Sequence, residues 1–130
     1  MSPEVVEHYH KAGRVIAEVR EKIKDVVKEG MPILTLCEEV EFLIKEMHCK
    51  PAFPCNVDVN EVAAHYTSPA DDVSFIPSGS VVKIDLGAHV NGYIADTAVT
   101  LSFDANRESM VWAVEEALER AVAMVRPGVK

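Results

Sequence analysis

The dipeptide Asn91-Gly92 stands between two runs of residues that are typical of β-strands, 81–90 and 93–103. Asn-Gly readily adopts the positive φ angles of a two-residue hairpin turn, and it is the strongest short hairpin signal in a sequence. The two runs are therefore predicted to form an antiparallel pair in which Val90 lies opposite Tyr93. No other feature of the chain constrains its fold as strongly.

The register set by this turn determines which side chains share a face of the hairpin. It places Asp85 opposite Ala98, and Gly87 then lies opposite Asp96. Opposed residues, and residues two apart on one strand, point to the same face, so the two aspartates are diagonal neighbours with Cα atoms about 7–8 Å apart. The other face is predicted to be a core face, with Thr97 as its one polar residue beside Val82, Ile84, Leu86, Ala88, Val90, Tyr93, Ala95, Val99 and Leu101.

Two neighbouring carboxylates repel each other unless a positive charge lies between them. At this spacing, Asp85 and Asp96 could converge on a pair of metal ions roughly 3.5–4 Å apart, as in two-metal hydrolases. Gly87 and Ala98, on the same face, would leave room for ions and substrate. The spacing alone fits equally well a solvent-facing hairpin with two surface acids, and a slip of one residue would place the aspartates on opposite faces.

An amphipathic helix is predicted to precede the hairpin, from residue 3 towards residue 30. Ser2 is its N-cap, Pro3 its first residue, and Gly30 its end, because glycine accepts the positive φ of a helix terminus. Gly13, inside the helix, costs stability relative to alanine, so close packing is expected there. Apolar residues recur every three or four positions, at Val5, Tyr9, Ala12, Ile16, Val19, Ile23 and Val26.

Two further helices are predicted. One opens at Thr35, in capping-box spacing with Glu38, and ends before Pro51. Its apolar positions are Leu36, Val40, Leu43 and Met47. The other is capped by Asp104 and carries apolar residues at Met110, Val114, Ala117, Ala121 and Met124 or Val125. Between these helices, residues 61–67 are expected to be extended.

Composition excludes several classes of protein. Hydrophobic residues make up 48% of the chain and charged residues 26%, as in soluble globular domains. No stretch approaches the roughly 20 apolar residues of a membrane span, and the early charges argue against a signal peptide. The formal net charge is −8 with scattered basic residues, which argues against nucleic-acid binding. The three cysteines Cys37, Cys49 and Cys55 form no CxxC pair and indicate reduced thiols in a cytosolic protein.

Three segments stand out together: residues 50–54, Lys-Pro-Ala-Phe-Pro; residues 60–67, Asn-Glu-Val-Ala-Ala-His-Tyr-Thr; and the hairpin from Lys83 to Ala98. In combination they resemble the type 2 methionine aminopeptidases, the archaeal members especially. The aspartate pair alone would fit the wider pita-bread family, including prolidases and aminopeptidase P, and the first two segments select the methionine enzymes. The resemblance extends over nearly all of the chain, without the Lys-rich extension of eukaryotic members.

The resemblance implies an α+β fold of the pita-bread (creatinase/aminopeptidase) type, in which amphipathic helices pack on an antiparallel sheet. Residues 1–130 would be the N-terminal half of that catalytic domain. The implied protein is a cytoplasmic aminopeptidase that removes the initiator Met by hydrolysis at two divalent metal ions (Co, Mn, Fe or Zn). Its implied partners are nascent polypeptides that begin with Met, and the ribosome, with no binding to membranes or nucleic acids.

The resemblance also implies roles for four residues. Asp85 would chelate one metal ion and Asp96 would bridge both. His65 would be the substrate histidine near the scissile amide, and Phe53 a wall of the pocket for the Met side chain. Without the resemblance, His65 would be a structural histidine and Phe53 a core anchor. No role is assigned to His8, His10, His48 and His89.

The chain holds only part of the ligand set that the family requires, since a His and two Glu ligands and a second substrate histidine belong to the C-terminal half. Residues 120–128 echo residues 22–30, helix end to helix end, which fits two pseudo-repeats with the second cut off at Lys130. Many amphipathic helices end in glycine, so the echo has an ordinary explanation as well. The fragment alone is expected to be inactive. Two other classes stay open, an inactive relative that binds protein or RNA and a half-domain that serves in assembly.

Overall fold

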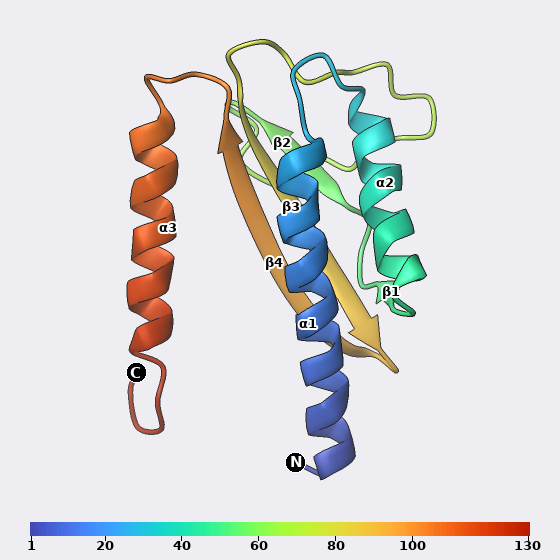
Figure 1. Ribbon diagram of the computed structural model, residues 1–130, viewed down its shortest axis with the longest axis vertical. Coiled ribbons are helices and arrows are strands. Elements are labelled where there is room, and N and C mark those ends of the chain that lie inside the picture. Colours follow the sequence, from blue (N-terminus) through green and yellow to red (C-terminus); the bar gives the residue numbers. More distant parts are fainter.

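The computed structural model describes residues 1–130 as three helices and one antiparallel sheet (Figure 1). The helices are α1 (Pro3–Val26), α2 (Ile33–Glu46) and α3 (Glu108–Ala123). The strands are β1 (Lys50–Pro51), β2 (Asn56–Val59), β3 (Val81–Val90) and β4 (Tyr93–Ser102). None of the helices combines the length and the apolar character that crossing a bilayer requires.

The predicted hairpin is confirmed residue by residue. Val90 lies opposite Tyr93 and Asp85 opposite Ala98 along β3 and β4, and the turn residues 91 and 92 both have positive φ. The sheet is larger than the sequence predicted, because β1 and β2 both pair with the other side of β3. β3 is thus the central strand, and β4 pairs with β3 alone.

The core lies between one face of this sheet and the helices α1 and α2 (Figure 1). On β3 the predicted core face is fully buried at Val82, Ile84, Leu86 and Ala88. The polar exception on this face, Thr97, accepts a hydrogen bond from Arg20 of α1 (3.2 Å). The helices contribute the buried residues Ala12, Val15, Ile16, Val19 and Ile23 of α1, and Ile33, Leu36, Cys37, Val40 and Ile44 of α2.

The ends of α1 are decided by one local and one distant contact. Ser2 caps the helix as predicted, because its hydroxyl accepts the N–H of Val5 (3.3 Å). The predicted end at Gly30 is wrong: the helix stops at Val26, and Val27 turns into an extended conformation with its side chain buried. Gly30 instead forms a turn with φ 75°, and its N–H donates to the carbonyl of Ile76, a residue distant in sequence.

The predicted capping box of α2 is wrong as well. The helix begins at Ile33 after Pro32, without a side-chain cap. The N–H of Ile33 donates to the carbonyl of Ser74 (3.0 Å). A carbonyl group from a distant part of the chain therefore accepts a hydrogen bond at the start of the helix, where side-chain caps from Thr35 and Glu38 were predicted.

Gly13 is not closely packed, contrary to expectation, since a Cβ built there meets no atom within 4 Å other than those of its chain neighbours and its own helix backbone. Gly13→Ala is therefore expected to raise the free energy of unfolding by about 0.5–1 kcal/mol, because alanine loses less backbone entropy in a helix. Urea denaturation measures the change. Gly30→Ala is the matched control, and it is expected to destabilise because φ is 75° there. A less stable Gly13→Ala variant would contradict the open environment of this residue.

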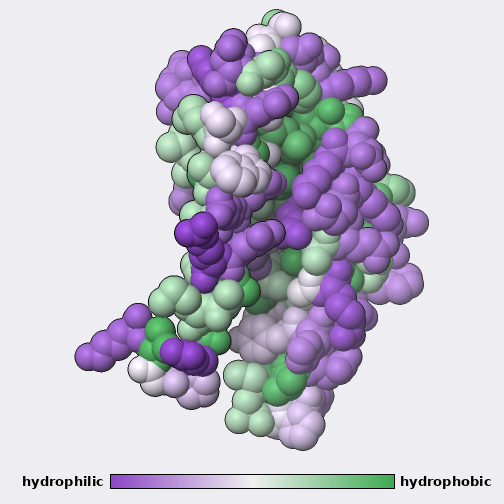
Figure 2. All heavy atoms as spheres, turned by 60° about the vertical axis from the view of Figure 1, so that its left-hand side comes forward, coloured by the Kyte–Doolittle hydropathy of each residue, from purple (hydrophilic) through white to green (hydrophobic).

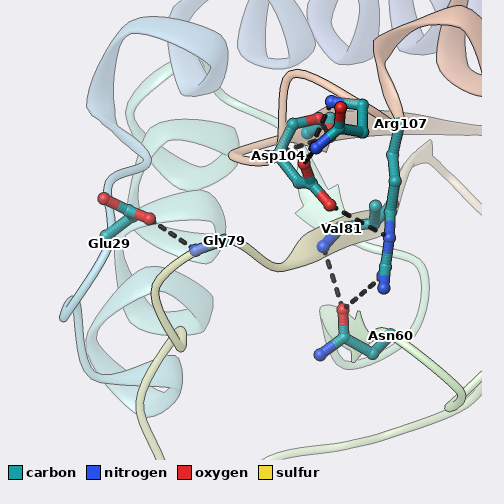
Figure 3. Close-up of polar contacts among 8 residues, drawn as sticks. Glu29, Asn60, Gly79, Val81, Asp104 and Arg107 are labelled. Carbon is teal, nitrogen blue, oxygen red and sulfur yellow. Dashed lines mark hydrogen bonds and ion pairs between the residues drawn. The ribbon is translucent and has the colours of Figure 1, made fainter.

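The segment between β4 and α3 is a turn whose side chains contact the residues around the start of β3 (Figure 3). Asp104 lies in this turn and pairs with Arg107 (3.3 Å), so the prediction that it caps the helix is wrong. Arg107 also donates to Asn60 Oδ1 (3.5 Å), which accepts the N–H of Val81 (3.0 Å). These contacts fix where α3 begins, at Glu108.

α3 contributes nothing to the core. None of its residues is buried, and five of its large apolar side chains are 57–65% exposed: Met110, Trp112, Val114, Leu118 and Val122. Figure 2, which brings this side of the molecule forward, shows hydrophobic surface among the polar residues. The predicted helix is present, but no element of the chain covers its apolar residues.

Candidate metal centre

Asp85 and Asp96 lie on the same face of the sheet, as the hairpin register predicted. Asp85 of β3 is paired with Ala98, and Asp96 of β4 is paired with Gly87, which makes the aspartates diagonal neighbours. This face, here called the site face, is opposite to the one covered by α1 and α2. Asp96 also lines a groove of about 750 Å³ between β4 and α3, which the basic side chains of Arg20, Lys24 and Lys83 line as well.

The two carboxylates have the electrostatics of a cation site. Burial, and after it the negative charge of Asp96, raises the pKa of Asp85 above its usual range. None of the ion pairs of the structure includes either carboxylate. Carboxylate oxygens that repel each other and take part in no ion pair suit a divalent metal ion.

This donor set fits a metal ion but does not complete a coordination shell. Nowhere in the chain do three His, Cys, Asp or Glu side chains gather in a way that could hold a metal. Metal ions of the kind expected here take four or more ligands. A metal ion held by Asp85 and Asp96 would therefore need further ligands from other groups. These ligands could approach through the groove beside Asp96.

Phe53 lies against the site face at Gly87. A Cβ added to Gly87 would come within 2.9 Å of Phe53 Cζ, so the ring occupies the place of a side chain. The N–H of Ala52 donates to the carbonyl of Gly87 (2.9 Å) and holds the segment there. The predicted space for ions and substrate is therefore filled at Gly87, whereas Ala98 lines the open groove.

Gly87→Ala is expected to displace the Phe53 ring and to cost about 1–3 kcal/mol of stability, the usual range for overpacking. Urea denaturation of the purified variant measures this. In a Phe53→Ala background the same substitution should cost much less, because the obstructing ring is gone. Ala98→Ser, in the open groove, is a control expected to change stability by no more than about 0.5 kcal/mol. Equal costs with and without the ring would contradict the contact.

His65 is brought towards Asp85 by a loop that runs back along β2. It is exposed and has a left-handed backbone conformation, with φ 69°. Burial raises the pKa of Asp85, and His65, like Lys83, is among the cationic groups that oppose this rise. The prediction that residues 61–67 are extended is wrong, because only Thr67 pairs with β2, through a single bridge to Asn56.

Sequence reasoning missed three polar residues of the site face, Asn56, Asp58 and Lys83. Asn56 lies opposite Asp85, and Asp58 lies opposite Lys83. Asp58 is only 2% exposed, and its Oδ2 lies 3.1 Å from Lys83 Nζ. The alternation Asn-Val-Asp-Val at residues 56–59 is the signal that could have revealed a strand with two polar residues on one face.

Neither His89, which is on the site face near the hairpin turn, nor any of the three cysteines joins the two aspartates in a metal-binding cluster. His89, at the end of the hairpin, accepts the N–H of Gly92 through Nδ1 (3.1 Å). The three cysteines are free and buried, as predicted for reduced thiols. The candidate centre therefore consists of the two aspartates with Phe53 and His65 around them.

Comparison with known proteins identifies the family of the chain. Residues 7–130 match the family described as Metallopeptidase family M24. The chain is 48% identical over 129 residues to a methionine aminopeptidase of Methanothermobacter thermautotrophicus. The matched region covers 97% of this chain and 43% of the relative. It is 41% identical over 138 residues to a methionine aminopeptidase of Methanothermus fervidus, with 96% of this chain and 73% of the relative covered.

A solved structure shows the same fold. The methionine aminopeptidase of Thermotoga maritima superposes with a TM-score of 0.89 at 27% sequence identity, covering 100% of this chain and 56% of that chain. The predicted α+β pita-bread fold is thereby confirmed, and the chain is part of such a domain. It spans less than half of the length of the Methanothermobacter relative.

Proposed function

Because the chain belongs to metallopeptidase family M24, we propose that it is the N-terminal half of a methionine aminopeptidase, which removes the initiator Met from nascent proteins. The observation that carries this proposal is the position of Asp85 and Asp96 as diagonal neighbours on one face of the hairpin. The finer assignment, to the type 2 enzymes of archaeal kind, is supported by the segments at residues 50–54 and 60–67.

For the metal centre we propose two divalent ions, drawn from Co, Mn, Fe and Zn. Asp85 would hold one ion and Asp96 would hold both. When bound, such ions lower the pKa of a shared water and polarise the scissile carbonyl. The carboxylates of this chain would contribute by fixing the ions on a rigid pair of strands, so that little reorganisation is needed during the reaction.

His65 and Phe53 would bind the substrate. The neighbours Ala63, Tyr66 and Thr67 of His65 take part in hydrogen bonds, but the His65 side chain does not, so its imidazole is available to meet the substrate amide. A hydrogen bond at that position would hold the scissile amide and stabilise charge that develops on it. The Phe53 ring would give an apolar wall for the Met side chain, next to the carboxylates.

The proposed substrates are nascent polypeptides that begin with Met. An enzyme that acts on them works in the cytoplasm and close to the ribosome, and these are the proposed location and partner. The acidic net charge of −8 argues against direct binding to nucleic acid.

A chimera tests the proposed function. Residues 1–130 are joined to the part of the Methanothermobacter relative that lies beyond the matched region, which supplies the missing ligands. Metal-dependent release of Met from Met-Ala-Ser peptides is expected, with the intact relative as the positive control. A folded, metal-loaded chimera that releases no Met, or that cleaves only peptides with proline in the second position, would refute the proposal.

A further inference from the structure

The loop that carries His65 is held by side chains of β2 and β3. On the C-terminal side of His65, the N–H of Tyr66 donates to Asp58 Oδ1 (2.9 Å). On its N-terminal side, the carbonyl of Ala63 accepts a hydrogen bond from Lys83 Nζ. His65 therefore lies between two anchored residues, and both anchors come from one pair of opposed side chains.

That pair, Asp58 and Lys83, is an ion pair on the site face. Oδ2 of Asp58 lies 3.1 Å from Nζ of Lys83, and the two side chains are 0% and 30% exposed. A fully buried carboxylate is costly unless a positive charge accompanies it. Each residue therefore fixes the other, and the pair acts as a single unit with one hydrogen bond to each side of His65.

The backbone of His65 needs such support. Its φ of 69° lies in the left-handed region, where a residue other than glycine costs on the order of 1 kcal/mol and persists only if its surroundings impose it. A third anchor follows, because Thr67 Oγ1 donates to Asn56 Oδ1 (2.7 Å). Asn56 is itself paired with Asp85, so the loop and the candidate metal ligand share one strand pair.

We propose that Asp58 and Lys83 are positioning residues, which hold His65 in its left-handed conformation with the imidazole near Asp85. This inference rests on the proposed function, in which Asp85 binds metal and His65 meets the substrate. The inference adds the two residues, Asp58 and Lys83, that would hold His65 in place relative to Asp85. Neither Asp58 nor Lys83 touches the substrate in this account, and both act through the loop.

Paramagnetic broadening by Mn²⁺ tests the inference on the 130-residue chain itself. Mn²⁺ is added at a small fraction of the protein concentration, because brief occupancy of a weak site suffices to broaden nearby NMR signals. Broadening is measured at the amides of Asp85 and Asp96 and at the ring protons of His65, with the His48 ring as reference. In the unmodified chain all three sites are expected to broaden more than His48.

The double variant Asp58→Val/Lys83→Met removes both anchors and leaves no unpaired buried charge. Such replacement of a buried pair by apolar residues is often neutral for stability, so the fold is expected to survive. Broadening should persist at Asp85 and Asp96 and fall several-fold at His65. Lys83→Arg keeps a charged donor and is expected to preserve the broadening at His65. Asp58→Asn, which removes only the charge, is a milder variant and should give a smaller loss.

The outcomes separate the two proposals. Unchanged broadening at His65 in a folded double variant would overturn the positioning role, and if the double variant does not fold, Asp58→Asn decides in the same way. No broadening at Asp85 and Asp96 in the unmodified chain would refute the metal site instead. In that case the positioning role is tested by hydrogen exchange of the Tyr66 amide. Exchange of this amide should be faster in the variants. An unchanged exchange rate would overturn the positioning role.

Discussion

The 130-residue chain alone is expected to release no Met above background from Met-Ala peptides, even with divalent metal in excess. Asp85 and Asp96 are two carboxylates without a third protein ligand beside them. They would hold a divalent ion weakly and leave most of its coordination to water. Relative to a complete enzyme, the expected loss is roughly 10⁶-fold or more, the usual scale of enzymatic acceleration.

The measurement is a peptide-release assay by mass spectrometry at several metal concentrations, on protein shown to be monomeric by analytical ultracentrifugation. The oligomeric state matters because a second copy could bring further carboxylates to the site. The chimera with the Methanothermobacter relative, assayed in parallel, shows that the substrate and the metal are competent. Robust metal-dependent release by the monomeric chain would mean that two carboxylates suffice, and the account of an incomplete centre would be wrong.

In a version that carries the missing ligands, such as the chimera, Asp96→Ala is expected to be more damaging than His65→Ala. Loss of Asp96 removes the proposed bridge between the ions, so bound metal and activity should fall together. His65→Ala should leave the metal in place and lower turnover by roughly 10²–10⁴, the range for a positioned acid–base or polarising group. The two variants should thus fail in different ways.

Atomic absorption counts the metal bound by each variant, and steady-state kinetics gives the turnover. His89→Ala is a matched histidine control, because His89 is on β3 but bonds only to the hairpin turn, and it should change neither quantity much. If His65→Ala loses its metal while Asp96→Ala retains two ions per chain, the proposed roles are reversed.

Local signals in the sequence were sufficient for the hairpin and for the start of α1, although the local caps predicted at Thr35 and Asp104 were wrong. The turn at residues 91–92 sets the pairing of β3 with β4, and the two-residue period of a strand then determines the face of every side chain. The common face of Asp85 and Asp96 followed from this argument alone. The same holds for the start of α1, where the cap at Ser2 is formed within one helical turn.

The site also depends on contacts between segments that are far apart in sequence, and these could not be read locally. β2 pairs with β3 over the pairs Asn56–Asp85 and Asp58–Lys83, and the loop at residues 60–67 bends because that pairing supplies its hydrogen-bond partners. Gly87 suggested an open space, but only the folded chain brings Phe53 onto it.

For the helices too, the sequence pattern predicted that they form, but only the folded structure shows which of them are buried. The apolar pattern predicted α1 and α3 alike, because periodicity reports which side of a helix is apolar. Whether that side is buried depends on a partner surface: α1 lies on β3 and β4, whereas no residue of α3 is buried. The sequence by itself determined the hairpin, its register and the shared face of the two aspartates, through bonds between near neighbours. Only the tertiary structure decided the conformation of His65, the place of Phe53 and the exposure of α3, because each depends on surfaces that distant segments bring together.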